Sequence, residues 1–210
     1  MKIQLIDYNQ ELCSEWRKEF EGCEDVEVTC GNFFEVPTNC FTSPANSFAF
    51  LNGGIDNHIR KYYEKNNVDI QRTVHDVIIS NFNSELLVGQ SIYIPINSFS
   101  KTNAPPDLIV APTMRVPMKL PHDTTNVYLA MRAILLKLKE LENFSRVRSV
   151  SISGLGTGIG QLPYDVCARQ MKMAYDDFWI GENYFPKTWM EAQDKHQIIS
   201  TNEINGDLQY

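Results

Sequence analysis

The chain has 210 residues, which suffice for one hydrophobic core but are few for two. With 43% hydrophobic and 21% charged residues, it has the composition of an ordinary globular protein. The net charge of −7 argues against extended, sequence-independent nucleic-acid binding, which needs many Lys and Arg side chains. It leaves a bound nucleotide open, because backbone amides alone can hold a phosphate.

The sequence carries no targeting, membrane or metal signal. The segment MKIQLIDYNQ has no long apolar run after a basic start, and no stretch reaches the roughly 20 apolar residues of a membrane span. We therefore expect a cytoplasmic protein without membrane contact. The five cysteines and four histidines lack metal-ligand spacing, so we expect reduced, mostly buried thiols, no metal and no cofactor. A nucleophilic cysteine is the less favoured alternative.

The first half of the chain alternates predicted strands with predicted helices. Apolar residues three or four apart predict amphipathic helices, and alternating or β-branched runs predict strands. These patterns predict strands over 2–8 and 26–29, helices over 10–20, from 55 onward and over 68–82, and a short segment over 39–42 that leads into a glycine-containing loop.

The second half continues in the same way. We expect strands over 91–96, 108–111 and 147–152, a loop over 97–106, a long helix capped by Asp123, a helix opened by Pro163 and a short helix near Trp189. Strands that alternate with helices along a whole chain indicate a three-layer α/β domain. We expect residues 1–210 to form one domain, with the motif-bearing part at about 26–180 and a C-terminal extension at 181–210.

The segment SPANSFAFLNGGIDNHIR, residues 43–60, carries the strongest motif. Gly53 and Gly54 lack side chains, so the backbone there can approach a ligand closely at the start of a helix, where free N–H groups favour anions. Asn46 and Asp56 flank this turn and are predicted to face one pocket. The alternatives are that Asp56 only stabilises the first helical turn and that Asn46 is only a turn residue.

A second glycine-rich loop runs from Gly154 to Gly160 between a predicted strand and a predicted helix. Its four glycines could wrap a diphosphate, with Thr157 adding a hydroxyl. The spacing matches neither the dinucleotide fingerprint nor the P-loop, and one such loop alone is equally well explained as a tight turn. Two such loops in one α/β domain favour phosphate binding, because ligands of these folds bind beyond the carboxyl ends of the strands.

The two loops together resemble the macro domain, the ADP-ribose-binding module. The family's Asn-Ala-Ala-Asn segment, glycine run and Val-Asp are similar to Ser43-Pro44-Ala45-Asn46 followed by Asn52-Gly53-Gly54-Ile55-Asp56. The family's second loop is similar to Gly156-Thr157-Gly158-Ile159-Gly160-Gln161, and its Gly-Asp-Ile to Gly31-Asn32-Phe33. The resemblance implies a mixed, mainly parallel sheet between helices, with ADP-ribose in a cleft at the strand ends.

The resemblance also implies roles for residues. Asn32 would meet adenine, the first glycine run would line the distal ribose, and the second loop would cradle the diphosphate. The implied ligand-binding residues are Asn32, Phe33, Asn52, Gly53, Gly54, Ile55, Gly156, Thr157, Gly158, Ile159 and Gly160. Two departures stand out: Asn32 replaces the family's acid, and Gly160 replaces an aromatic residue that packs on the distal ribose.

Asn46 and Asp56 match the pair that assists attack of water on the distal ribose in hydrolytic MacroD-type members. We expect a hydrolase in which Asp56 is the base, with its pKa raised by like-charge repulsion from the diphosphate. Its substrate would be ADP-ribose carrying a protein ester, an acetyl ester or a 1″-phosphate. The alternatives are a non-catalytic binder of ADP-ribose and a structural domain without a ligand. Arg115 either reaches a phosphate or forms an exposed salt bridge.

Overall fold

The computed structural model describes residues 1–96, 105–142 and 147–200. Its elements alternate along the chain as the sequence predicts. In chain order they are β1 (Lys2–Asp7), α1 (Gln10–Glu19), β2 (Val26–Cys30), β3 (Cys40–Ser43), α2 (Gly54–Lys65), α3 (Ile70–Asn81), β4 (Ile92–Ile94), β5 (Asp107–Val110), α4 (Asn126–Leu141), β6 (Ser149–Ile152), α5 (Tyr164–Tyr175), the π-helical turn η2 (Asp176–Ile180) and α6 (Trp189–Ser200).

The strands form one six-stranded sheet in the order β2-β1-β6-β3-β5-β4. All neighbouring pairs are parallel except β4 and β5, which are antiparallel. The predicted mixed, mainly parallel sheet is therefore confirmed. Because β1, β6, β3 and β5 run in the same direction, their carboxyl ends meet along one edge of the sheet.

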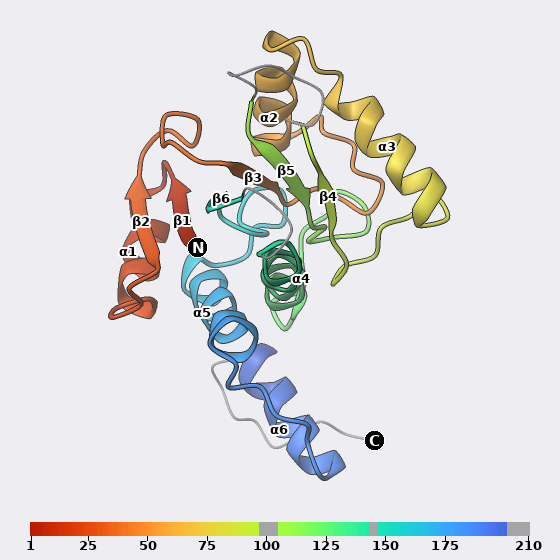
Figure 1. Ribbon diagram of the computed structural model, residues 1–210. Coiled ribbons are helices and arrows are strands. Elements are labelled where there is room, and N and C mark those ends of the chain that lie inside the picture. Colours follow the sequence, from red (N-terminus) through yellow and green to blue (C-terminus); the bar gives the residue numbers. More distant parts are fainter. Residues whose placement is uncertain (97–104, 143–146, 201–210) are drawn as a thin grey trace.

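Helices cover both faces of the sheet (Figure 1). Side chains alternate between the two faces along each strand, so Ile3 and Leu5 of β1 pack with α1, α4 and α5, whereas Ile6 packs with α2 and α3. Each face has its own buried cluster, and Trp16 of α1 and Tyr63 of α2 are among the largest fully buried side chains. This arrangement confirms the three-layer α/β/α architecture.

The long helix α4 begins later than the sequence predicts. Asp123 does not cap it: the helix starts at Asn126 with Thr125 in the cap position and no side-chain cap bond. The reason is a preceding turn in which the N–H of Thr124 donates to the carbonyl of Pro121 and the Thr124 hydroxyl accepts from the N–H of Asn126. Asp123 lies inside that turn, before the first helical residue.

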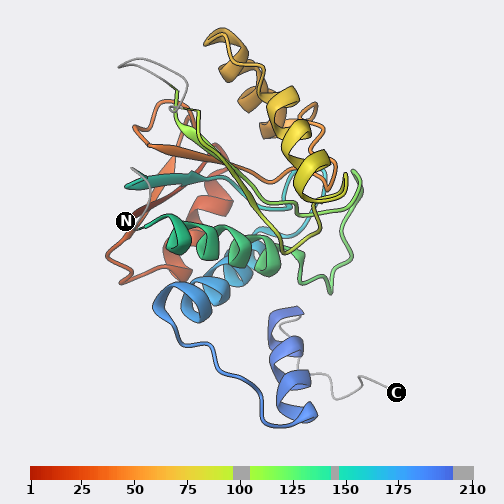
Figure 2. The same ribbon diagram turned by 45° about the vertical axis from the view of Figure 1, so that its right-hand side comes forward.

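The predicted helix that Pro163 opens and that runs through Phe178 is confirmed. The helix α5 continues into η2 and ends at Gly181, whose φ of +96° is the left-handed conformation of a helix terminus. Asp25 accepts hydrogen bonds from Tyr175 and Trp179 and so ties this end to the β2 region. The predicted short helix near Trp189 is the 12-residue α6, which lies beyond α5 on the side away from the sheet (Figures 1 and 2).

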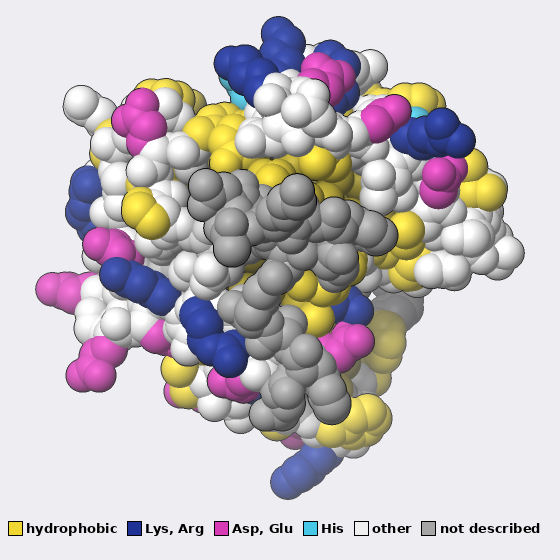
Figure 3. Space-filling view, turned by 45° about the horizontal axis from the view of Figure 1, so that its top comes forward, with side chains coloured by type: hydrophobic (Ala, Val, Ile, Leu, Met, Phe, Trp, Pro, Cys, Tyr) yellow, Lys and Arg dark blue, Asp and Glu magenta, His cyan; other side chains and the backbone are white. Residues whose placement is uncertain are grey.

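Other sequence expectations meet the structure as follows. The loop expected over 97–106 falls mostly on 97–104, outside the described residues. All five cysteines are free, and three of them, Cys13, Cys40 and Cys167, are buried. None of the described helices is long and apolar enough to cross a membrane. On the face drawn in Figure 3, Lys and Arg side chains are interspersed with Asp and Glu.

Candidate functional site

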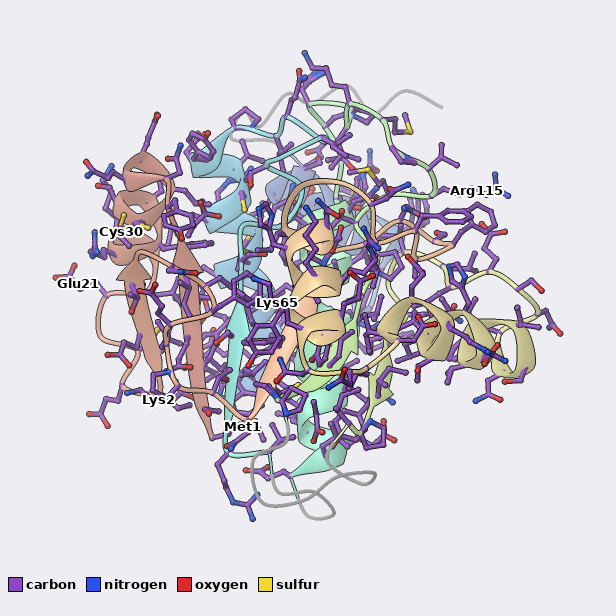
Figure 4. The ribbon with its side chains drawn as sticks, turned by 90° about the horizontal axis from the view of Figure 1, so that it is seen from above. Met1, Lys2, Glu21, Cys30, Lys65 and Arg115 are labelled. Carbon is purple, nitrogen blue, oxygen red and sulfur yellow. The ribbon has the colours of Figure 1, made fainter. Side chains whose placement is uncertain are left out.

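A cleft of about 780 Å³ lies at the carboxyl ends of the parallel strands. Figure 4 shows the direction of the strands: Lys2 at the start of β1 lies at the opposite end of the sheet from Cys30, which ends β2. The chain segments that follow β2, β1, β6, β3 and β5 all contribute to the wall of the cleft. This is the position at which open α/β sheets bind ligands.

Every residue that the sequence analysis proposed for the site lines this cleft. They are Asn32, Phe33, Asn46, Asn52, Gly53, Gly54, Ile55, Asp56, Gly156, Thr157, Gly158, Ile159 and Gly160. The structure thus brings together both glycine loops, which are about 100 residues apart in the chain. Their individual roles follow from the local geometry.

The first glycine loop leads directly into α2. Gly54 has a φ of +50°, a left-handed conformation that glycine adopts without strain. Gly53 occupies the cap position and has no side chain to bond the first helical turn, so the N–H groups there remain open to a ligand. Asp56 lies in this first turn. A backbone of this shape suits an anion in front of the helix.

Asp56 is a partly buried carboxyl group in the cleft wall. One of its oxygens accepts a hydrogen bond of 2.6 Å from the hydroxyl of Ser43, the last residue of β3. Burial raises the pKa of Asp56 to about 6, and the Ser43 hydroxyl opposes part of this rise. The direction agrees with our expectation, and the cause within the protein itself is desolvation by burial.

Asn46 forms the turn that was its alternative interpretation. Its side-chain oxygen accepts from the N–H of Phe48 at 3.1 Å, and its amide donates to the carbonyl of Phe50 at 3.3 Å. The main chain also pairs with Met114, beyond β5. The side chain is 6% exposed and still borders the cleft. Asn46 therefore stabilises the conformation of the first glycine loop, and any contact that it makes with a ligand is additional to this role.

The second glycine loop is folded tightly at Gly160. A Cβ atom there would lie 2.4 Å from the carbonyl oxygen of Gly156, so no other residue fits this conformation without a backbone shift. The carbonyl of Gly160 accepts from the N–H of Leu120. An aromatic side chain, which Gly160 replaces according to the resemblance, would not fit this loop conformation. Ile159, half exposed, reaches across to the position where a Cβ on Gly53 would be, 3.1 Å away.

The side chain of Asn32 is engaged within its own turn. Its oxygen accepts from the N–H of Phe34, and its amide donates to Glu35 at 2.8 Å. Phe33, only 3% exposed, packs against the rings of Phe34 and Phe41. Asn32 and Phe33 therefore line the part of the cleft that follows β2, and both side chains are held by contacts within the protein.

Sequence reasoning missed the other residues of the cleft wall. The chain there comes from the end of β1, the start of α1, the residues after β3 and β5, and the start of α5. The missed lining residues include Asp7, Tyr8, Asn9, Phe34, Pro44, Ala45, Phe50, His58, Thr113, Met114, Pro117, Ser153 and Tyr164. The signal that could have found Asp7 is its place at the carboxyl end of the first predicted strand.

Three side chains outside the predicted site also have clear positions. Arg115 forms an ion pair of 2.7 Å with Glu85 and points outward (Figure 4), so the salt-bridge alternative describes it. Phe50 is 51% exposed and borders the cleft, so its ring is not part of the buried core. Burial raises the pKa of Cys13 to about 11, an environment that disfavours the nucleophilic thiolate.

Metal ligation receives no support in the described residues. Within 1–96, 105–142 and 147–200, no group of three or more His, Cys, Asp and Glu residues is placed to hold a metal ion. No Lys or Arg in these ranges lines the cleft either. In the described chain, an anion in the cleft would therefore meet main-chain N–H groups, hydroxyls and the side chains of His58 and the lining asparagines.

Known structures share this architecture. The protein is similar to the macrodomain of Mycobacterium tuberculosis DarG, with a TM-score of 0.55 and 15% identity over 70% of this chain and 87% of that one. It is similar to an Oceanobacillus iheyensis macrodomain variant with ADPR, with a TM-score of 0.56 and 16% identity over 80% and 86%. The chain has the macro-domain fold. Thermosipho africanus DarTG in complex with ADP-ribose gives a TM-score of 0.54 at 14% identity, over 80% of this chain and 48% of that one.

Comparison by sequence finds less similarity to known proteins than comparison by structure does. No protein-family model matches the chain. An uncharacterised protein of Aquifex aeolicus (strain VF5) is 29% identical over 154 residues, which are 70% of this chain and 78% of that protein. In this chain, the cleft combines a first glycine loop that leads into α2 with a second loop that has no room for a side chain at position 160.

Proposed function

We propose that this protein binds ADP-ribose in the cleft and hydrolyses a bond at the distal ribose. The single observation that carries the proposal is Asp56, a partly buried carboxyl group with a pKa of about 6 beside an open helix start and two glycine loops. Such a group is ionised at neutral pH and still a good proton acceptor, which is what a general base needs. The ADP-ribose complexes among the structural neighbours support the choice of ligand.

The proposed binding mode follows the length of the cleft. The diphosphate lies between the first turn of α2 and the loop from Gly156 to Gly160, where N–H groups and the Thr157 hydroxyl donate to its oxygens. The distal ribose lies by Gly53 and Asp56. Water attacks the anomeric carbon as the bond from that carbon to the leaving carboxylate or phosphate oxygen breaks. Asp56 takes the proton from the attacking water, and its negative charge stabilises the oxocarbenium-like transition state. Asn46 supports this end through the turn that it closes.

A second candidate is a module that binds ADP-ribose without turnover. One observation favours it: both polar atoms of the Asn46 side chain are engaged with the main chain of their own loop, which leaves Asp56 with less help in orienting the ribose. In both cases the ligand is ADP-ribose or an ADP-ribosylated molecule. The two candidates differ only in whether a product forms.

The experiment titrates ADP-ribose into the wild type and Asp56→Ala by calorimetry. Both proteins are then incubated with ADP-ribosylated protein, O-acetyl-ADP-ribose and ADP-ribose-1″-phosphate. We expect both to bind and only the wild type to form product, with a loss of about 100-fold or more in the variant. Binding by both without product would establish the binding module. Absence of binding by the wild type would refute both candidates.

A further inference from the structure

Two cysteine side chains lie close together behind the wall of the cleft, where β1 and β2 end. Cys13 belongs to α1 and is fully buried, whereas Cys30 is the last residue of β2 and is exposed. Both are free cysteines in the structure. Gly31 and Asn32, which follow Cys30 directly, line the cleft. Neither thiol has a role in the proposed function.

The period of β2 directs the Cys30 side chain toward α1. Residues two apart on a strand have their side chains on the same face. Val26 and Val28 of β2 pack against the buried cluster that contains Cys13. Cys30 continues that series, so its side chain lies on the same face of the sheet. Its register partner in β1 is Asp7, and Figure 4 shows the labelled Cys30 beside α1.

The sulfur atom of Cys13 lies at the same pair of strand ends. Its thiol contacts the carbonyl oxygen of Asp7 at 3.4 Å and that of Thr29 at 3.8 Å. The Thr29 carbonyl belongs to the peptide unit that ends at the Cα atom of Cys30, so Cys13 Sγ lies within about 7 Å of that Cα atom. The Cys30 thiol in turn contacts the carbonyl oxygen of Tyr8, the residue after Asp7, at 3.7 Å.

The two thiols also interact with each other. Burial raises the pKa of Cys13, and a side-chain hydrogen bond with Cys30 adds to this rise. A hydrogen bond between two thiols brings their sulfur atoms close enough for side-chain rotation to join them. The backbone movement that distant cysteines need before they can be bridged is not required here.

We propose that Cys30 and Cys13 form a reversible redox site, which a hydroperoxide converts into a disulfide. The Cys30 sulfur attacks the peroxide, the O–O bond breaks, and Cys30 becomes a sulfenic acid while the hydroperoxide leaves as an alcohol with the thiol proton. The Cys13 sulfur then attacks the Cys30 sulfur, and the hydroxyl group leaves with the Cys13 proton as water. Two thiols are oxidised and one peroxide is reduced, and a dithiol reductant reverses the change.

The different exposure of the two thiols sets the order of the steps. An oxidant in solvent reaches Cys30, whereas Cys13 is covered by the core and its thiolate is disfavoured by burial. Cys13 therefore reacts second, with a partner that is already in contact with it. This proximity favours the disulfide over further oxidation of Cys30 and over reaction with another molecule. The product links α1 to the end of β2, directly behind the cleft.

The test treats the reduced full-length chain with hydrogen peroxide and follows it by intact mass and non-reducing peptide mapping. We expect the wild type to lose about 2 Da through a Cys13–Cys30 linkage within one chain, and dithiothreitol to restore the mass. Cys30→Ser should form no disulfide, and Cys13→Ser should stop at a Cys30 sulfenic acid, which a 1,3-diketone probe traps.

The matched control is Cys23→Ser, which should leave the reaction unchanged. Cys23 is partly exposed, but its carbonyl accepts from the N–H of Val26 at the start of β2, and that strand spans about 13 Å to Cys30. It also lies ten residues beyond Cys13, past the far end of α1. Cys23 is therefore too distant to pair with either sulfur atom.

Three results would overturn the proposal: a sulfinic acid at Cys30 without a disulfide, a linkage between two chains, and no change in mass. Circular dichroism melting shows whether Cys13→Ser is folded. The mapped linkage of the wild type and the exposed substitution Cys30→Ser test the site independently of that variant. No ligand takes part in this experiment, so its result stands whether or not the chain binds ADP-ribose.

Discussion

The Asp56 end and the Asp7 end of the cleft each present one carboxyl group, yet the two groups have different surroundings. Asp56 is partly buried, accepts from a hydroxyl and has a pKa raised to about 6. Asp7 accepts from two main-chain N–H groups, those of Asn9 and Gly154. The difference indicates a division of work: Asp56 is suited to exchange a proton, whereas Asp7 is suited to stay in place as an acceptor.

The largest expected effect concerns the pH dependence of turnover. If Asp56 is the base, it must be ionised, so kcat/KM should fall about tenfold per pH unit below its pKa of about 6 and be level above it. The measurement is a pH–rate profile of the wild type between pH 4.5 and 8 on whichever of the three candidate substrates forms product. Asp7→Asn should leave the shape of the profile unchanged. If Asp7→Asn shifts the pH at which kcat/KM falls, the carboxyl groups at the two ends do not have separate roles.

The second glycine loop lies between the Asp56 end and the Asp7 end of the cleft. Gly160→Ala tests how far the tight conformation of this loop determines stability and ADP-ribose binding. The new Cβ would lie 2.4 Å from a backbone oxygen, so we expect the free energy of unfolding to fall by about 1–3 kcal/mol and ADP-ribose binding to weaken. The control is Gly53→Ala, whose Cβ meets only the flexible tip of Ile159 at 3.1 Å and should cost less than about 1 kcal/mol. Urea denaturation measures both. Equal costs would show that the tight fold at Gly160 does not constrain the loop.

Asp56→Asn should stabilise the protein at neutral pH. The pKa of Asp56 is raised from 3.8 to about 6 in the folded state, so folding favours the protonated form. This favourable contribution is complete below pH 3.8 and is lost as the pH rises through 6, which leaves an unfavourable partly buried charge at pH 7.5. We expect the variant to gain about 1–2 kcal/mol at pH 7.5, after allowance for partial exposure, and almost nothing at pH 4. Thermal melting at both pH values decides this.

The smallest expected effect is at the Asp7 end. Asn9→Ala removes the cap of α1 and the hydrogen bond to Tyr164, which should lower the free energy of unfolding by about 1 kcal/mol. Amide hydrogen exchange should speed up in the first turn of α1 and stay the same in α2. Asn81→Ala, at the exposed end of α3, serves as the matched control. Faster exchange at α2 would mean that the two ends are not structurally independent.

The two ends also differ in how well the sequence predicts them. The Asp56 end is built from one continuous segment, residues 43–56, so its glycines and carboxylate appear together in the sequence. The alternation of strands and helices likewise predicts the three layers, because burial on both faces imposes that pattern locally. The errors of this local reasoning are small. For example, α4 begins at Asn126, although Asp123 was predicted to cap it.

The Asp7 end is assembled from segments far apart in the chain, and the sequence alone does not join them. Asp7, Ser153 and Tyr164 meet only because β1 pairs with β6 inside the sheet. The first strand was recognised, but its place in the sheet order depends on long-range packing. For the same reason, Asn32 was assigned from the resemblance, whereas its hydrogen bonds within the turn are visible only in three dimensions.

The turn closed by Asn46 has a consequence for the thermodynamics of binding. Its main chain is tied to its surroundings, since the N–H of Ser47 donates to Met114 and the carbonyl of Ser47 accepts from Leu86. The loop is therefore ordered before a ligand arrives, and its conformational entropy is lost during folding rather than during association. A ligand meets a preorganised surface, so the affinity of this end should depend on the contacts made there and little on the cost of arranging the loop.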